Sequence, residues 1–337
     1  MIPEEKAAAV ARALAETFGV TECEDIQRIT KGNNTSRVFR VVVHGTPYLL
    51  KTILRTDDAT RHYACMRTAA DAGLAPAVRY TNLEDRVSIT DFVETAPLPV
   101  GDALVRIPDV LRRLHALPPF PEIPNWLNTS CLFLLNQDPA LDSFLEKFRA
   151  AGLLPTPEMD EMFARHAEIA AVYPHHEPDM VSCHNDLFKP DNILFDGGRI
   201  WLVDWECAFR NDRYADLAVV AHQVVANDAE ERAFLQEYFG APPDPYQSAR
   251  FFLMRQVSHI FYTMAFLFIG AAGKPVDWSE PAADFRELNR RIWAGEVNLA
   301  DPPAKITYGR AHWQQFCANL QLPRYRESLR IVSERQA

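Results

Sequence analysis

Acidic, amide and lysine side chains are concentrated in one short stretch of the chain, HNDLFKPDNILFDGGRIWLVDWE, which covers residues 184–206. Its second half reads as two short strands joined by the turn DGG at residues 196–198, where glycines supply the positive φ angles that a tight reversal needs. Folding about this turn sets Asn192 roughly opposite Asp204. An amide oxygen and a carboxylate therefore meet at one end of the hairpin, and Asp186 lies in the loop just before it.

Oxygen ligands of this kind suit Mg²⁺. This ion usually takes one or two protein carboxylates and completes its coordination with water and phosphate oxygens. The chemistry that the stretch favours is therefore phosphoryl transfer.

The overall composition is that of an ordinary soluble protein. The chain has 337 residues and is 48% hydrophobic, which allows a sizeable core in two domains or one two-lobed fold. There are 45 acidic and 35 basic residues, the formal net charge is -10, and lysines and arginines form no cluster, so nucleic-acid binding is disfavoured. The six cysteines form no CxxC pair, so neither a zinc site nor a disulfide framework is indicated, and a reducing compartment fits best.

No membrane or export segment is expected. The N-terminus, MIPEEKAAAVARALAETFG, has acidic residues and helical spacing where a signal peptide has a basic start and an apolar run. Residues 251–273 are strongly apolar, but they include Arg255, Gln256 and His259, which a lipid-facing span rarely tolerates. We predict a buried core helix there and a cytoplasmic protein.

The first hundred residues alternate like a sheet, and the remainder is mostly helical. Residues 37–53 predict a hairpin around the turn HGTP, and a helix ending at Gly73 follows it. VSITDFVETAPLP then reads as a strand that leaves through a proline-containing connector at residues 96–99, the expected boundary between lobes.

These pieces together resemble the kinase-like phosphotransferases, the superfamily of aminoglycoside phosphotransferases, choline kinases and, more distantly, protein kinases. HNDLFKPDN resembles their catalytic loop and VDWE their metal-binding strand end, and the pairing of the two is most similar to the choline kinase branch. LLKTI, TDFVE, LRRLHAL and NDRYADLA match further parts in order, and the resemblance implies that Asp216 in the last of these braces the catalytic loop. The resemblance implies an α+β, bilobal protein-kinase-like fold. Its small antiparallel-sheet lobe would span residues 1–96, and its larger, mainly helical lobe would span residues 97–337.

The resemblance also implies roles for individual residues. Asp186 would accept the proton of, or orient, the attacking hydroxyl of a small-molecule substrate, and Lys189 would meet the γ-phosphate of ATP. Asn192 and Asp204 would hold Mg²⁺. The residues expected to bind the nucleotide are Lys51 for the phosphates, Gly32, Asn33, Asn34, Thr35 and Ser36 in the covering loop, and Phe92 and Glu94 in the connector.

The sequence says less about the acceptor, the small molecule that receives the phosphate, than about the nucleotide site. Choline-like ammonium groups are held by aromatic faces and carboxylates, and aminoglycosides by several carboxylates. The candidate substrate residues are Trp205, Glu206, Asp212 and Tyr262. Glu206 is also a candidate ligand of a second metal ion, because it stands two residues after Asp204 and would share its face of an extended strand. An amino alcohol is the preferred acceptor, an aminoglycoside is the alternative, and the oligomeric state is left open. A protein kinase is less favoured because HRD, DFG and APE motifs are absent from the sequence.

Two features depart from the family pattern. Asp186 and Asn192 are six positions apart (192 − 186 = 6), one more than usual, as if Phe188 were inserted, so the loop is expected to bulge. The helix after Lys51 has His62, Tyr63 and Ala64 where a glutamate usually pairs with that lysine. A catalytically weak chain that only binds nucleotide is therefore a second hypothesis, and Lys51 is expected to find another partner.

Overall fold

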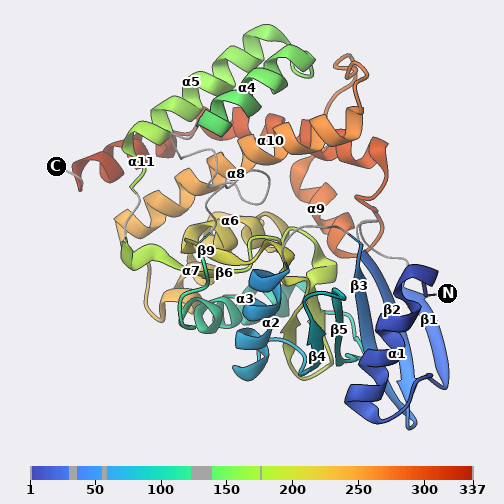
Figure 1. The fold of residues 1–337 in the computed structure, drawn as a ribbon. Helices are drawn as coiled ribbons and strands as arrows, with labels where there is room; N and C mark the ends of the chain where they lie inside the picture. Colours follow the sequence, from blue (N-terminus) through green and yellow to red (C-terminus); the bar gives the residue numbers. More distant parts are fainter. Residues whose placement is uncertain (1, 30–35, 55–58, 123–138, 175–176, 336–337) are drawn as a thin grey trace. The chain divides into compact units, whose positions relative to one another are not determined.

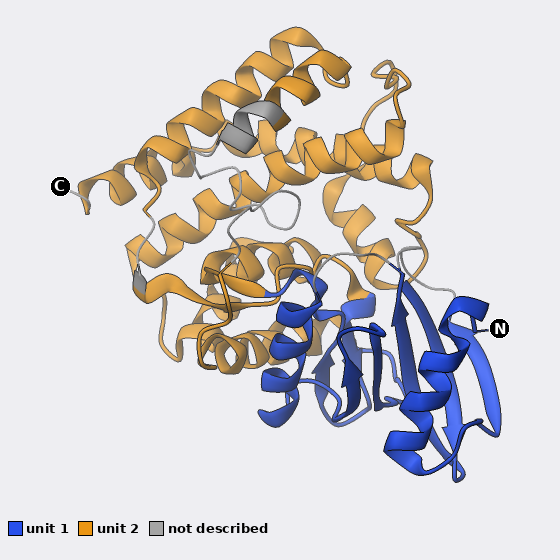
Figure 2. Ribbon diagram, in the orientation of Figure 1, with its two compact units in different colours: residues 1–98, 191–208 blue, residues 99–190, 209–337 orange. Residues whose placement is uncertain are grey.

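The computed structural model describes residues 2–29, 36–54, 59–122, 139–174 and 177–335. The chain forms two compact units, shown in Figure 2: Met1–Leu98 with Asp191–Ala208, and Pro99–Pro190 with Phe209–Ala337. The first break falls two residues after the boundary predicted at Ala96 (98 − 96 = 2). The hairpin of the motif stretch lies within residues 191–208 and therefore belongs to the first unit, although the residues directly before and after this range belong to the second.

The described part of the first unit is built on a five-stranded antiparallel sheet with the order β1-β2-β3-β5-β4 (Figure 1). Its elements up to Leu98 are α1 (Glu4–Phe18), β1 (Asp25–Ile29), β2 (Ser36–Val43), β3 (Thr46–Ile53), α2 (Thr60–Asp71), β4 (Val78–Asn82) and β5 (Val87–Asp91). One face of α1, including Val10 and Leu14, forms a core with Phe39, Leu50 and Ile89 of the sheet. Burial of each such large apolar side chain stabilises the unit by about 1.5–3 kcal/mol.

The hairpin predicted over residues 37–53 is confirmed. Strands β2 and β3 pair antiparallel from Ser36 with Ile53 to Val43 with Thr46. His44 and Gly45 between them have φ angles of 50° and 71°, which is the pair of positive values that a type I′ turn requires. The turn fixes the register, and the register places Lys51 on β3 opposite Val38.

The hairpin predicted in the motif stretch is also confirmed, with one correction. Strands β7 (Ile193–Phe195) and β8 (Ile200–Leu202) pair antiparallel. Of the two turn glycines, Gly197 alone has a positive φ, 91°. The rest of the reversal depends on Asp196, whose Oδ1 accepts hydrogen bonds from the backbone N–H groups of Gly198 and Arg199, both at 2.8 Å. These hydrogen bonds from the backbone to the Asp196 side chain stabilise the turn, so a second glycine with a positive φ is not needed.

Most elements of the second unit are helices. They are α3 (Val100–His115), α4 (Pro139–Ala151), α5 (Thr156–Val172), α6 (Arg213–Val224), α7 (Asp228–Phe239), α8 (Pro245–Ala271), α9 (Phe285–Trp293), α10 (Pro302–Leu320) and α11 (Pro323–Glu334). Strands β6 (Met180–Cys183) and β9 (Phe209–Asp212) form a two-stranded sheet at the start and the end of the motif region.

Helix α8 is the core helix that the sequence predicts. Among the described residues it is the one helix long and apolar enough to cross a membrane, yet 72% of that apolar window is buried inside the protein. It packs against α6, α10 and α11 (Figure 1). Two of its polar residues have internal partners: Arg255 pairs with Glu231 at 3.0 Å, and Gln256 bonds to the carbonyl of Phe252.

Candidate functional site

Lys51 is held between two carboxylates in the first unit. Its Nζ lies 2.7 Å from Oδ1 of Asp204 and 2.8 Å from Oε1 of Glu206, and its side chain is 11% exposed. Burial alone would lower the pKa of this lysine, but the two carboxylates outweigh that effect and raise the pKa above its ordinary value. The ammonium therefore stays charged, and Asp204 and Glu206 are the partners that take the place of the missing helix glutamate.

Asp204 adopts a backbone conformation that non-glycine residues rarely adopt. Its φ and ψ angles are 69° and 63°, in the left-handed region. The chain then turns through a short 3₁₀ helix, η4 (Trp205–Cys207). Glu206 was expected to share a face with Asp204 on an extended strand, and that reason is wrong because the segment is turned. The turn nevertheless brings both carboxylates to Lys51.

The turn after Asp204 is fastened to α2 by a residue that sequence reasoning missed. Arg61 donates a hydrogen bond from Nη2 to the carbonyl of Glu206 at 2.9 Å, and from Nη1 to the carbonyl of Ala208. Cys65, one turn further along α2, also contacts the carbonyl of Ala208. The signal in the sequence was the positive charge of Arg61, directly before His62, where the family usually has its helix glutamate.

Asn192 lies at the same end of the hairpin as Asp204, as predicted. The N–H of Val203 donates a hydrogen bond to the carbonyl of Asn192 at 3.0 Å, which ties the residue before Asp204 to Asn192. Asn192 is 4% exposed, and the side chain of Asp204 is 35% exposed. A buried amide oxygen and a more open carboxylate are a donor set that fits Mg²⁺, whose remaining positions are filled from outside the protein.

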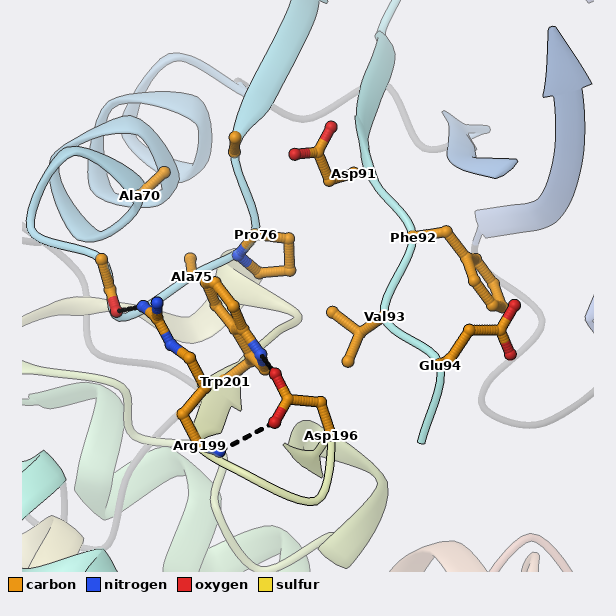
Figure 3. A pocket seen from close by; sticks show the side chains of 12 residues that line it. Ala70, Ala75, Pro76, Asp91, Phe92, Val93, Glu94, Asp196, Arg199 and Trp201 are labelled. Atoms are coloured by element: carbon orange, nitrogen blue, oxygen red, sulfur yellow. Dashed lines mark hydrogen bonds between the residues drawn. The ribbon is translucent and has the colours of Figure 1, made fainter. Parts of the chain in front are cut away.

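The connector after β5 borders an open pocket of about 540 Å³ within the first unit (Figure 3). Val93 projects toward Trp201 of β8, while the side chains of Phe92 and Glu94 project to the other side of the connector. Arg40 of β2 lies 5.4 Å from the ring of Phe92 and 3.9 Å from Glu94. Phe92 and Glu94 thus lie near Arg40 of β2.

The predicted phosphate-covering loop is described only at its end. Ser36 is the first residue of β2 and pairs with Ile53. Gly32, Asn33, Asn34 and Thr35 lie outside the described residues.

In the second unit, Asp186 and Lys189 form an ion pair. Nζ of Lys189 lies 2.8 Å from Oδ2 of Asp186, whose side chain is 11% exposed. Asn185 just before them has a φ of 65°, and its side-chain oxygen accepts a hydrogen bond from Asn211 at 2.5 Å. The left-handed backbone of Asn185 and the buried hydrogen bond to its side chain therefore fix the course of the loop just before Asp186.

Asp216 braces this loop, as the sequence indicated. Its carboxylate accepts the backbone N–H groups of His184 and Asn185 at 2.8 and 2.7 Å, and Nε2 of His115 lies 3.3 Å away. Burial would raise the pKa of Asp216, but the contacts with His115 and with the backbone N–H of His184 lower it below its ordinary value. Sγ of Cys183 lies 3.8 Å from Nε2 of His115, so His115, Cys183 and Asp216 together support the loop.

Replacing Asp216 with asparagine is expected to lower the free energy of unfolding by about 3 kcal/mol, because one of the two backbone donors loses its acceptor and the buried charge network is broken. Since the folded pKa of Asp216 lies below the unfolded value, this stabilisation is present at neutral pH and is lost as the pH falls below about 4. Urea unfolding at pH 7 and pH 3.5 would measure both effects. Asp228→Asn, at the exposed start of α7, is the control; equal stability of the two variants at pH 7 would contradict the bracing role.

Phe188, the apparent insertion, anchors the loop to the core. Its ring centroid lies 5.3 Å from that of Tyr262 and 5.6 Å from that of Phe266, both on α8, and Gln223 donates a hydrogen bond to its carbonyl at 3.1 Å. The additional residue is therefore accommodated by directing one aromatic side chain into α8.

Several residues considered for substrate binding have structural roles. Trp205 is 1% exposed. Asp212 is also 1% exposed, caps the N-terminus of α6 through the N–H of Tyr214 at 2.8 Å, and pairs with Arg250 at 2.5 Å. Tyr262 packs against Phe188 and is 5% exposed. This arrangement does not support contact between these three side chains and an acceptor, whereas Glu206 stays beside Lys51.

Comparison with known proteins agrees with these features. A family model described as the phosphotransferase enzyme family matches residues 25–252, which is more than half of the chain. No curated protein matches the chain by sequence.

Solved structures show the same fold along nearly the whole chain. A choline/ethanolamine kinase family protein from Mesorhizobium loti is 19% identical with a TM-score of 0.66, and the match covers 98% of this chain and 99% of that chain. A choline kinase from Cryptosporidium parvum is 11% identical with a TM-score of 0.66, and the match covers 97% of this chain and 98% of that chain. A spectinomycin phosphotransferase in complex with ADP and spectinomycin is 15% identical with a TM-score of 0.54, and the match covers 90% of this chain and 98% of that chain. The chain has a protein-kinase-like fold and belongs to the phosphotransferase enzyme family.

Proposed function

We propose that this phosphotransferase moves the γ-phosphate of ATP to a hydroxyl group of a small molecule in a Mg²⁺-dependent reaction. The observation that carries the proposal is the placement of Lys51 between Asp204 and Glu206, at 2.7 and 2.8 Å. A buried lysine that shares its charge with a candidate metal ligand is poised to exchange that partner for a phosphate oxygen.

The residues of the first unit are proposed to bind the nucleotide. Lys51 would donate to phosphate oxygens, and Asp204 and Asn192 would hold the metal. Bound Mg²⁺ would offset the negative charge of the phosphates. Phe92 and Glu94 would border the base, and the loop that contains Gly32 would cover the phosphates through its backbone N–H groups.

The residues of the second unit are proposed to act on the acceptor. Asp186 would orient the acceptor hydroxyl and take its proton as the new O–P bond forms and the bond between the γ-phosphorus and the leaving ADP oxygen breaks. Lys189, 2.8 Å from Asp186, would place an ammonium beside the transferring group. The Asp216 brace would keep Asp186 aimed without itself touching the substrate.

An amino alcohol such as choline is the proposed acceptor. Support comes from the choline kinase and the choline/ethanolamine kinase family protein among the similar structures, and from the net charge of -10, which attracts a cation. The similarity to a spectinomycin phosphotransferase makes an aminoglycoside-like antibiotic the second candidate. A cytoplasmic location is proposed because ATP and reduced cysteines are both found there.

The acceptor is identified by a thermal-shift screen followed by turnover. With a nonhydrolysable ATP analogue and Mg²⁺ present, the true acceptor class is expected to raise Tm further, because a ligand stabilises by its own occupancy. Amino alcohols, aminoglycosides and sugars would be compared, and ADP production would be measured for each compound that shifts Tm. Nucleotide binding without ADP production for any compound would instead favour a chain that binds nucleotide and does not catalyse transfer.

A further inference from the structure

Three buried histidines from three helices meet in the core of the second unit. His222 of α6, His259 of α8 and His312 of α10 are 4%, 0% and 0% exposed. One potential ligand atom of each lies within 4.8 Å of the other two. Helices α8 and α10 run side by side in Figure 1, and α6 also packs on α8, so the three side chains project from a rigid frame. The proposed phosphotransfer chemistry uses none of them.

Most of the nitrogens in this histidine cluster are unsatisfied. Nδ1 of His259 and Nδ1 of His312 are 2.9 Å apart and share one hydrogen bond. The other four ring nitrogens, including both of His222, have no hydrogen-bond partner among the residues that the structure describes. Each buried polar atom left in this state costs about 1–3 kcal/mol. A ligand that accepts lone pairs from several imidazoles would remove this cost.

We propose that His222, His259 and His312 form a binding site for Zn²⁺. The ion takes imidazole nitrogens at about 2.0–2.1 Å in tetrahedral geometry, which sets two ligand nitrogens about 3.3 Å apart. The separations in the cluster, 2.9 Å for one pair and at most 4.8 Å for every pair, bracket this value. No pair of ligand atoms therefore has to approach by more than about 1.5 Å to reach it (4.8 − 3.3 = 1.5).

The protonation state of the cluster suits a metal. Burial lowers the pKa of all three imidazoles well below the ordinary histidine value, so each is neutral at pH 7 and offers a lone pair. In the metal-bound form the proton shared by His259 and His312 would move to the other ring nitrogen of its histidine, which leaves both Nδ1 atoms to bind the ion.

The surroundings close the site to solvent on several sides. The ring of Phe285 lies 5.5, 5.0 and 4.8 Å from the rings of His222, His259 and His312. The positive charge of Arg255 would oppose the binding of a cation, but its guanidinium is paired with Glu231 at 3.0 Å. Because the cluster supplies three ligands, the fourth position of a tetrahedral ion is left for water or hydroxide, as in other sites with three histidines. The inferred role is structural, since the ion would join α6, α8 and α10.

The test is metal content and thermal stability of the full chain, freed of any polyhistidine tag and produced with or without added Zn²⁺. About one Zn²⁺ per chain is expected in the loaded protein by elemental analysis, with a Tm at least about 4 °C above that of the metal-poor protein. Co²⁺ used in place of Zn²⁺ is expected to give the visible bands of a tetrahedral ion without a sulfur-to-metal band. Absence of bound metal after production in Zn²⁺, or a metal that adds no stability, would overturn the proposal.

Two variants separate this site from other sources of zinc. His222→Phe keeps an aromatic ring beside Phe285 but removes both nitrogens, and it is expected to lose the metal and the Zn²⁺-dependent rise in Tm. Without a metal site the same change would be neutral or stabilising, because it removes two unsatisfied buried atoms. Cys183→Ala removes the thiol of the other group of potential ligands, His115, Cys183 and Asp216, and should retain the ion. Zinc that is retained in His222→Phe would refute the assignment, and loss of zinc in Cys183→Ala would place the ion in the other group instead.

Discussion

Replacing Asp186 with alanine is expected to lower turnover by roughly 10² or more, because the acceptor hydroxyl loses the group that orients it and takes its proton. Nucleotide affinity is expected to change little, since the proposed nucleotide ligands Lys51, Asn192 and Asp204 all belong to the first unit. Steady-state turnover on the identified acceptor and calorimetric titration with an ATP analogue would measure the two quantities.

The control for this experiment is Asp228→Asn, which changes an exposed carboxylate of the same unit and should keep turnover close to that of the unmodified protein. Asp186→Asn adds a second test, because it keeps the size of the side chain and removes its basicity. If Asp186 acts through proton transfer, the asparagine and alanine variants should be similarly slow. Turnover near the original level in either variant would remove Asp186 from the mechanism.

The local elements were predictable because short-range chemistry determines them. The turn at His44 and Gly45 requires positive φ angles, and the alternation on either side of it defines the strands of residues 36–53. Lys51 could be identified because a lysine inside an apolar strand needs a partner. The Asp216 brace followed from the order of motifs, and the structure confirms it at 2.7 and 2.8 Å.

Partners that lie far apart in the sequence were not predictable. Asp212 looked like a candidate for a cationic substrate, but Arg250, 38 positions later, takes its carboxylate inside the core. Nothing local distinguishes a carboxylate that faces a ligand from one that faces a buried arginine. The three histidines of the cluster are likewise spread over 90 positions (312 − 222 = 90), and only the packing of three helices brings them together.

Glu206 was predicted to lie on the same side of the chain as Asp204, and the reason for that prediction is wrong. An extended strand would place Asp204 and Glu206 on one face, but the left-handed backbone of Asp204 starts a turn instead. Such a conformation costs of order 1–3 kcal/mol for a residue other than glycine, so no propensity scale predicts it. The hydrogen bonds from Arg61 to the carbonyls of Glu206 and Ala208 help to hold it.

Replacing Asp204 with asparagine is expected to raise the Mg²⁺ concentration needed for half-maximal activity by roughly tenfold or more and to lower turnover as well. A neutral amide lacks the charge that holds a hard cation, and Lys51 loses one of its two carboxylate partners. Titration of Mg²⁺ against activity at saturating ATP would measure the shift.

Asn192→Ala is the matched comparison at the other predicted ligand. It should shift the Mg²⁺ requirement in the same direction but less, because an amide oxygen contributes less to a divalent ion than a carboxylate does. The two residues lie at the same end of one hairpin, tied by the bond from Val203 to the carbonyl of Asn192, so general damage to the hairpin would affect both variants alike. An unchanged requirement in Asp204→Asn refutes the metal assignment. An unchanged requirement in Asn192→Ala alone means that Asp191 or water supplies the second ligand, and Asp191→Asn then distinguishes these two.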